Sequence, residues 1–202
     1  MKLRNTFAIV IATACAGYLS SSAMAFDGQR KGFVLGGGIG VSPSAGIHSD
    51  AVLFSLPGGG TIVDEFDESK AGPAANLMIG YAWDEFNMLV FEVNAASFTS
   101  DILLDDGGNE AEVSLGFVGA SWYHYFGPAG HTPFINLGLG SFAFQIEDND
   151  NIDPGFGGQG GVGYEFARHF QVGGYVSFGQ SSDGTNDFTH TMVNFIVSGV
   201  VF

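Results

Sequence analysis

The sequence predicts an all-β protein, an eight-stranded antiparallel up-and-down barrel that crosses a membrane. The chain is 46% hydrophobic and only 13% charged, and it contains 32 glycines and 20 phenylalanines. After Ala25 no stretch reaches the 18 or more consecutive apolar residues of a membrane-spanning helix. Large apolar residues instead alternate with small or polar ones at the strand period of two. Only a closed barrel satisfies every backbone donor and acceptor of strands in lipid.

The first 25 residues have the features of a cleaved signal peptide. Two basic residues precede the largely apolar stretch 6–19, and Ala23 and Ala25 supply the small residues that signal peptidase accepts. We expect cleavage after Ala25 and a mature chain, 26–202, that forms one domain. The only cysteine would be lost with the leader, so no disulfide is expected.

Eight segments show the alternation of a membrane strand. They are 31–42, 74–82, 87–97, 112–126, 132–146, 155–166, 170–179 and 189–202. In the first, Phe33, Leu35 and Ile39 share one face, and glycines share the other. This pattern predicts large side chains toward lipid and small ones toward the interior of a narrow barrel.

The fourth segment has its large side chains at odd positions. The odd set is Val113, Leu115, Phe117, Tyr123 and Tyr125, whereas Glu112 and His124 belong to the opposite set. We expect the odd set to face lipid, with the tyrosines in an interfacial aromatic girdle, and Glu112 to face the lumen.

The connections between the segments alternate between long and short. The long ones are about 43–70, 99–111, 147–154 and 180–188, and together they hold 15 of the 21 carboxylates. Bacterial membrane barrels have long extracellular loops and short periplasmic turns. The alternation therefore predicts an acidic extracellular end, and the longest connection is of a length typical of functional loops.

Polar residues at predicted inward positions form the candidate site. They are Glu92, Asn94, Glu112, Gln159, Glu165 and Gln171. Few inward cations accompany them, and an unpaired buried charge is costly, so some of these carboxylates are expected near the rim or in contact with water. Eight strands leave an interior just wide enough for side chains, which favours a filled core. The abundant inward glycines keep a narrow channel as the alternative.

The closing segment is ambiguous in its facing. Counting back by twos from Phe202 places Ser198 and Asn194 in the same set, so two polar residues would interrupt a lipid face. Either the strand contains a bulge, or Phe202 lies off the main register.

The charge balance excludes several classes of function. The formal net charge is -15, and without Lys2 and Arg4 the mature chain would keep four basic residues against 21 acidic ones. Such a chain repels nucleic acid phosphates and anionic lipid headgroups. We therefore predict no nucleic acid partner.

Several of these segments resemble a known superfamily. The glycine-interleaved segment 33–40, the segment 132–140, the Ala-Met-Ala leader end and the terminal Phe202 are similar to those of the small eight-stranded outer-membrane barrels of the OmpA, OmpX and OmpW type. The resemblance covers the whole mature chain. It implies a porin-like barrel in the Gram-negative outer membrane, contact with lipid and lipopolysaccharide, and recognition of Phe202 by the barrel assembly machinery.

The resemblance does not decide the function, because the superfamily contains adhesins, structural anchors, narrow channels and lipid-modifying enzymes. We expect a non-enzymatic protein with a structural or surface-interaction role, in which the acidic loops meet an extracellular partner. The alternatives are an OmpW-like channel for small or apolar solutes and a lipid A-modifying enzyme.

Catalytic, cofactor and metal sites are not predicted. Lipid A deacylases of the superfamily carry a His-x-Ser pair, whereas His48 is followed directly by Ser49 and His190 by Thr191. Residues 147–153 resemble a calcium-binding loop only in composition, because isoleucine and aspartate occupy its fifth and sixth positions. Divalent cations that bridge these carboxylates, or connect them to lipopolysaccharide phosphates, remain an alternative.

Overall fold

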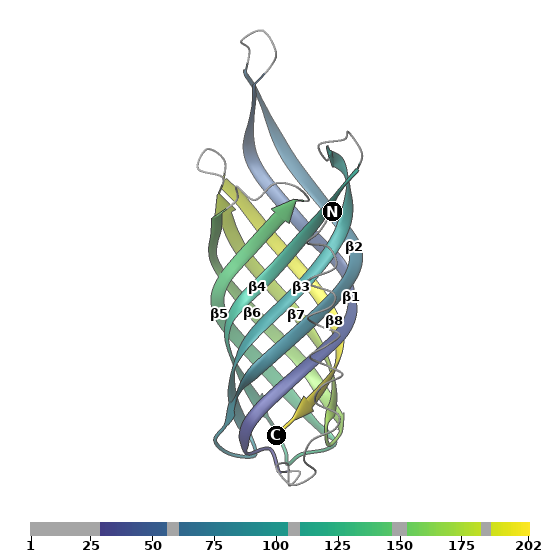
Figure 1. Ribbon diagram of the computed structural model, residues 1–202, viewed down its shortest axis with the longest axis vertical. Helices are drawn as coiled ribbons and strands as arrows, with labels where there is room; N and C mark the ends of the chain where they lie inside the picture. The colour runs from purple at the N-terminus through teal and green to yellow at the C-terminus, as the bar shows by residue number, and fades with distance from the viewer. Residues whose placement is uncertain (1–28, 56–60, 105–109, 147–152, 183–186) are drawn as a thin grey trace, which may run out of the picture.

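The computed structural model describes residues 29–55, 61–104, 110–146, 153–182 and 187–202. They form eight strands: β1 (Gly32–Ser55), β2 (Thr61–Ala82), β3 (Asn87–Leu104), β4 (Glu110–Tyr125), β5 (Thr132–Ile146), β6 (Asp153–Ala167), β7 (Phe170–Ser182) and β8 (Asp187–Val201). Each strand pairs antiparallel with the next, and β8 closes on β1 (Figure 1). The predicted eight-stranded up-and-down barrel is confirmed. The predicted signal peptide, with Ala23 and Ala25, lies outside the described residues.

The outer face of the barrel is apolar. Large hydrophobic side chains from seven of the eight strands are exposed on it, including Ile39, Leu139 and Phe156, whose exposed fractions are 77%, 65% and 69%. A surface with so much contiguous apolar area requires lipid rather than water as its solvent. None of the described segments forms a helix long and apolar enough to cross a membrane.

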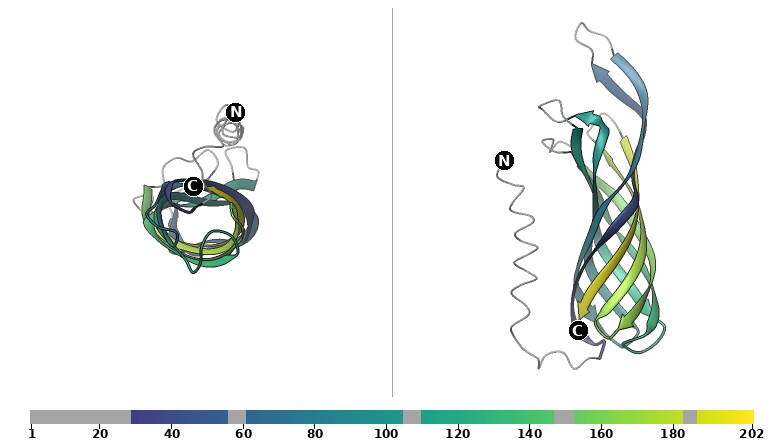
Figure 2. Two further views of the ribbon diagram at one scale, coloured as in Figure 1. Left: turned by 90° about the horizontal axis from the view of Figure 1, so that it is seen from below. Right: turned by 90° about the vertical axis from the view of Figure 1, so that its right-hand side faces the viewer.

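The two ends of the barrel differ: one has short turns, and at the other a hairpin projects beyond the rim. The turns β2–β3, β4–β5 and β6–β7 lie at one end together with Phe202, and the β1–β2 hairpin rises beyond the opposite rim (Figures 1 and 2). Gly32, at φ 102°, turns the chain into β1, and Gly130 and His131, at φ 90° and 62°, turn it between β4 and β5. We call the end with the short turns the periplasmic end and the opposite one the extracellular end.

The predicted extents of the long connections were wrong. β1 continues to Ser55 and β2 begins at Thr61, so most of 43–70 belongs to a hairpin. The strands likewise extend into 99–111, 147–154 and 180–188. Polar residues do not end these strands, because backbone pairing continues above the lipid, where water solvates the side chains. Asp67 is exposed in this way, whereas its neighbour Glu68 is buried on the inward face.

The predicted facing of the fourth segment was also wrong. Val113, Leu115, Phe117, Tyr123 and Tyr125 are all buried inside the barrel. The reason is that the two tyrosine hydroxyls find buried acceptors, and the apolar side chains pack in the interior near the extracellular end. The exposed aromatic side chains at or near the short turns are others: Tyr81, Trp83, Phe86, Phe126, Phe166 and Phe170.

The structure resolves the ambiguity of the last strand. Phe202 is only 3% exposed, and Ser198 and Asn194 are also buried, whereas Phe195 and Val197 are exposed. The terminal residue therefore lies off the lipid face. β8 pairs with β7 without a shift, and the register shift against β1 falls between Val41 and Ser44, so β1 carries the extra residue.

Candidate functional site in the barrel interior

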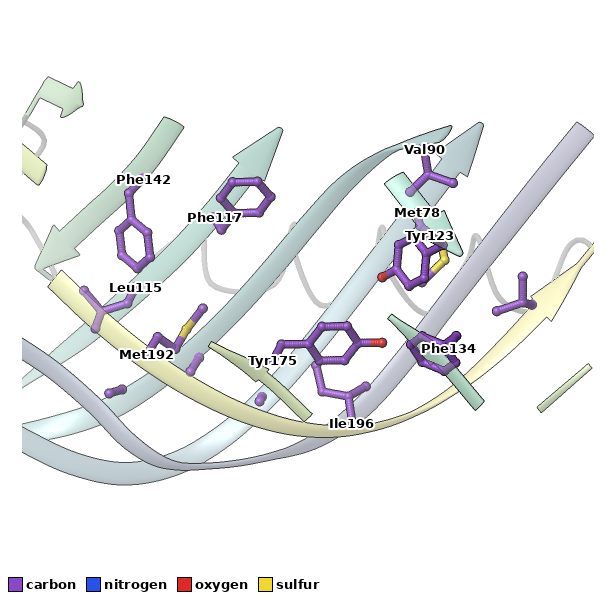
Figure 3. Close-up of a cluster of buried hydrophobic side chains, with 14 of the residues drawn as sticks. Met78, Val90, Leu115, Phe117, Tyr123, Phe134, Phe142, Tyr175, Met192 and Ile196 are labelled. Carbon is purple, nitrogen blue, oxygen red and sulfur yellow. The ribbon is translucent and has the colours of Figure 1, made fainter. Parts of the chain in front are cut away.

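Buried side chains fill the interior. Figure 3 shows a cluster of them, in which the side chains of Phe117, Phe142, Tyr175 and Met192 point into the barrel. Each of these four is at most 1% exposed. Polar groups occupy the middle of the interior and the periplasmic end, and mostly apolar groups occupy the extracellular part. The chemistry of these three levels decides whether solutes can pass.

Gln159 of β6 is the centre of the middle level. Its Nε2 donates hydrogen bonds to Glu92 Oε2 and Asn136 Oδ1, both at 3.1 Å. Its Oε1 accepts hydrogen bonds from Asn94 Nδ2 at 2.9 Å and from the Ser177 hydroxyl at 3.1 Å. Glu92 and Asn94 come from β3, three strands away around the barrel, so these bonds cross the lumen.

Further hydrogen bonds extend this level to other strands. The Tyr123 hydroxyl donates to Glu92 Oε1 at 2.8 Å, and Asn194 Nδ2 donates to Asn94 Oδ1 at 2.8 Å. Both carboxylate oxygens of Glu92 therefore accept hydrogen bonds, which offsets part of the cost of its complete burial. We call the six residues Glu92, Asn94, Tyr123, Asn136, Gln159 and Asn194 the lumen belt.

Arg30 occupies the interior at the periplasmic end. Its Nη2 donates to Glu165 Oε2 at 2.5 Å, and both side chains are almost completely buried. The guanidinium also lies 3.5 Å from the centre of the Tyr125 ring and donates to the backbone carbonyl of Glu85 in the β2–β3 turn. The Gly130 N–H donates to the second carboxylate oxygen of Glu165. These contacts tie Arg30, two residues before β1, to two periplasmic turns and to β6.

The extracellular part of the interior is mostly aromatic and aliphatic. The rings of Phe142 and His190 stack at 5.4 Å, and Phe144 lies 5.2 Å from the same imidazole. His190 Nε2 shares a hydrogen bond of 2.6 Å with the Ser181 hydroxyl. This histidine, one of the two considered for catalysis, is thus enclosed by the barrel and does not reach its outer surface.

Five of the six predicted lumen residues lie in the interior. Glu92, Asn94, Gln159, Glu165 and Gln171 are each at most 3% exposed, and Gln171 Oε1 accepts a hydrogen bond from the Tyr125 hydroxyl at 2.8 Å. They do not form one cluster, because Glu165 and Gln171 lie at the periplasmic level.

Glu112 is the exception, since it is exposed on the outward face of β4 opposite Thr99. Glu112 was predicted to face the lumen because the facing predicted for β4 was wrong. Arg30 was not predicted, because it precedes the alternating segment and no pattern marks it. The need for a cation near Glu165 was the only available signal.

The described residues contain no group of three or more His, Cys, Asp or Glu side chains able to hold a metal ion. Residues 147–152, which hold most of the acidic cluster considered for calcium, lie outside the described part of the chain.

Comparison with known proteins supports the architecture. No protein family model matches the chain, and no curated protein matches it in sequence. Its structure is similar to the crystal structure of the outer membrane protein OprG from Pseudomonas aeruginosa, with a TM-score of 0.50 and 15% identity over 86% of this chain and 97% of that one. The chain has the fold of a small outer-membrane barrel.

Two further solved structures are similar. Ail, the attachment invasion locus protein of Yersinia pestis, gives a TM-score of 0.47 at 13% identity over 85% of this chain and 99% of that one. The outer membrane protein AlkL gives 0.46 at 15% identity over 91% and 94%. At these identities the likeness concerns the fold alone. The closed barrel and its apolar outer face are those of a protein that resides in the bacterial outer membrane.

Proposed function

We propose that this outer-membrane barrel is a non-enzymatic protein that acts at the cell surface through the β1–β2 hairpin. The observation that carries the proposal is the length of these strands. β1 has 24 residues and β2 has 22, whereas the other six have 13 to 18. The hairpin consequently rises above the rest of the barrel (Figure 2), where a partner outside the cell can reach it.

The β1–β2 hairpin leaves the barrel wall in steps. The backbone register of β2 with β3 ends at Ala74, which follows Pro73, because proline has no N–H with which to continue a ladder. On the other side, β1 stays paired with β8 as far as His48. Beyond His48 and its partner Asp67, the strand pairs that the structure describes for β1 and β2 are with each other, as far as Ser55 and Thr61. This arrangement supports a surface role, because the outer part of the hairpin projects beyond the neighbouring strands.

The filled interior supports this function over the alternative of a narrow channel. The lumen belt crosses the barrel, and Arg30 with Glu165 occupies the periplasmic end. A solute would have to break several buried hydrogen bonds to pass, each of which leaves unsatisfied groups at a cost of about 1–3 kcal/mol.

The charge of the extracellular end indicates the chemistry of the partner. The sequence between Ser49 and Lys70 contains five carboxylates and no basic residue. A surface of this kind attracts cationic partners over a distance of about 8–10 Å at physiological ionic strength. We therefore propose a basic partner surface, or envelope components bridged to these carboxylates by divalent cations.

Shortening the hairpin tests the proposal. His48 and Asp67 are a cross-strand pair, so an Asn-Gly turn can replace residues 49–66 without a change of register. We expect cells that display this variant to lose most of their adhesion to polylysine-coated beads. Replacement of 147–152 by a short turn is the matched control. Equal adhesion of the wild type and the shortened variant, at equal amounts of heat-modifiable folded barrel, would contradict the surface role of the hairpin.

The enzymatic alternative has its own test. Mass spectra of lipid A from cells with and without the protein are expected to be identical. A new or missing acyl chain in the presence of the protein would replace the proposal with a lipid-modifying activity.

We also propose that Phe202 is read by the barrel assembly machinery before the barrel closes. In the folded protein its ring is buried, 5.2 Å from the ring of His169 and 5.8 Å from the Arg30 guanidinium. Deletion of Phe202 is expected to lower the amount of assembled barrel in the outer membrane, because recognition of the terminal residue would be lost while the chain is still unfolded.

A further inference from the structure

The outer wall of the barrel contains a hollow of about 170 Å³, lined by residues of β8, β1 and β2. Its lining includes a cross-strand row in which Gly46 of β1 lies between Thr191 of β8 and Ser69 of β2. Gly46 leaves the wall thin, because a Cβ at this position would come within 3.2 Å of Ser69 Cβ. The hydroxyl of Ser69 shares a 2.9 Å hydrogen bond with that of Ser44, which also lines the hollow.

The next row toward the extracellular end is more polar. It consists of Thr189, His48 and Asp67, which are paired across β8, β1 and β2. Thr189 and Asp67 are exposed, and His48 is half-buried on the same outward face. Their side chains give the hollow hydroxyl, imidazole and carboxylate groups, and the lining contains no lysine or arginine.

The hollow lies at the upper boundary of the apolar band. The last exposed apolar pair below it is Val41 with Phe195. The outward residues from Phe33 to Val41 span about 27 Å along β1, or about 20 Å across the membrane at a strand tilt of about 40°. Since the apolar band of such barrels is about 25 Å tall, it ends near Ser44 and Gly46. The hollow therefore opens at the depth of the outer-leaflet headgroups.

We propose that this hollow binds the sugar headgroup of an outer-leaflet glycolipid, with the acyl chains lying along the wall below it. Hydroxyl groups donate and accept hydrogen bonds, and a carboxylate accepts two or more, which suits the several hydroxyls of a sugar ring. A phosphate is disfavoured, because Asp67 repels it and the lining contains no lysine or arginine to compensate. The exposed side chains of Val41 and Phe195 supply apolar contacts for the lipid chains.

The test uses the full mature protein, refolded in dodecylphosphocholine, which has no sugar that competes. The probes are monoglucosyl diacylglycerol, rough lipopolysaccharide and phosphatidylglycerol, and native mass spectrometry measures the fraction of protein that retains each one. We expect the two sugar-bearing lipids to be retained about tenfold better than phosphatidylglycerol. Equal retention of phosphatidylglycerol would overturn the assignment of a sugar site.

Substitutions in the hollow test whether the glycolipid binds there. Gly46→Leu fills the hollow and is expected to reduce retention of the glucolipid about tenfold. Gly160→Leu is the matched control, because Gly160 also lies in the wall, on β6, and a Cβ there meets the Leu137 side chain at an ordinary 3.9 Å. If Gly46→Leu does not fold, the double variant Ser69→Ala/Thr191→Ala removes the hydroxyls without added bulk. Wild-type retention by a folded variant of either kind would overturn the proposal.

Discussion

Gln159 bonds two side chains across the lumen and two on the neighbouring strands, so its removal is the most direct test of the lumen belt. Replacing Gln159 with leucine keeps a similar volume but removes hydrogen-bond partners from Glu92, Asn94, Asn136 and Ser177. We expect Gln159→Leu to lower the free energy of unfolding by about 3 kcal/mol or more, because each unsatisfied buried group costs about 1–3 kcal/mol.

Urea unfolding in lipid vesicles, followed by tryptophan fluorescence, measures this effect. The control is Gln180→Leu, because Gln180 is exposed on the outward face of β7, and it should change the free energy by no more than about 0.5 kcal/mol. Equal stabilities of the two variants would show that the lumen belt does not stabilise the barrel.

A second prediction concerns the stability that the ion pair of Arg30 and Glu165 contributes. Arg30→Ala leaves the Glu165 carboxylate buried with its charge uncompensated, and loss of one partner of a buried pair costs about 3–5 kcal/mol. Adding Glu165→Gln removes that charge, so the double variant is expected to recover part of the loss. Arg168→Ala, at an exposed position, should be nearly neutral. The same urea titration tests all three, and a double variant less stable than Arg30→Ala would contradict the assigned role of the pair.

At the residue scale, the sequence was sufficient to predict whether a side chain faces inward where the residue lies inside a regular alternation. Glu92, Asn94 and Gln159 were predicted inward because large apolar residues alternate with small or polar ones in the sequence around them. Which of them touch could not be predicted, since contacts across the lumen depend on the closure of the barrel. Arg30 was beyond prediction because its position results from the turn at Gly32 and not from strand periodicity.

At the scale of single elements, hydrogen bonds within the β2–β3 turn change the pKa of Asp84. Asp84 Oδ1 accepts a hydrogen bond from the Phe86 N–H at 2.7 Å, and both carboxylate oxygens accept from Asn87 Nδ2 at 3.0 Å. Partial desolvation raises the pKa of Asp84, but these hydrogen bonds, with a contribution from His124, outweigh it and hold the pKa below its ordinary value of 3.8.

This lowered pKa predicts a pH dependence. Because the folded state favours the ionised carboxylate, its contribution is fully present above the pKa of the unfolded chain and is lost as the pH falls from about 5 through the lowered value. Asp84→Asn should therefore be less stable than the wild type at pH 6 and approach it near pH 2. A constant difference in urea midpoint across this range would contradict the prediction, and a ¹³C NMR titration of the Asp84 carboxyl measures the pKa directly.

The eight strands and their order were predictable, whereas the strand lengths and the facing of β4 were not. β4 was placed the wrong way round because apolar character was taken as a mark of the lipid face. In this barrel the interior near the extracellular end is apolar too, so Val113, Leu115 and Phe117 of β4 pack there, and the outward face of β4 carries the small residues Gly116 and Ala120. Hydrophobicity alone cannot separate two apolar environments, and only pairing with β3 and β5 decides between them.

At the scale of the whole molecule, the barrel combines a closed lower part with a projecting hairpin. The periplasmic end is occupied by Arg30, Glu165 and Phe202, and the middle is occupied by the lumen belt. The hairpin extends β1 and β2 beyond the lipid. Under the proposed function, this division separates stability, which the interior provides, from interaction with a partner, which the projection provides. It also implies that the interior does not need to conduct.

Electrical recording tests this implication. The wild-type barrel in planar bilayers is expected to give no discrete current steps, because the hydrogen bonds from Gln159 to β3 and the Arg30–Glu165 pair obstruct the lumen at two separate levels. A general porin in the same lipid is the positive control, and heat-modifiable mobility verifies that the inserted protein is folded. Discrete steps of reproducible size from the wild type, abolished by an agent that blocks the lumen, would instead establish the channel. In that case the lumen belt must open in the membrane, and Gln159→Leu should change the size of the steps, since Gln159 would then line the path.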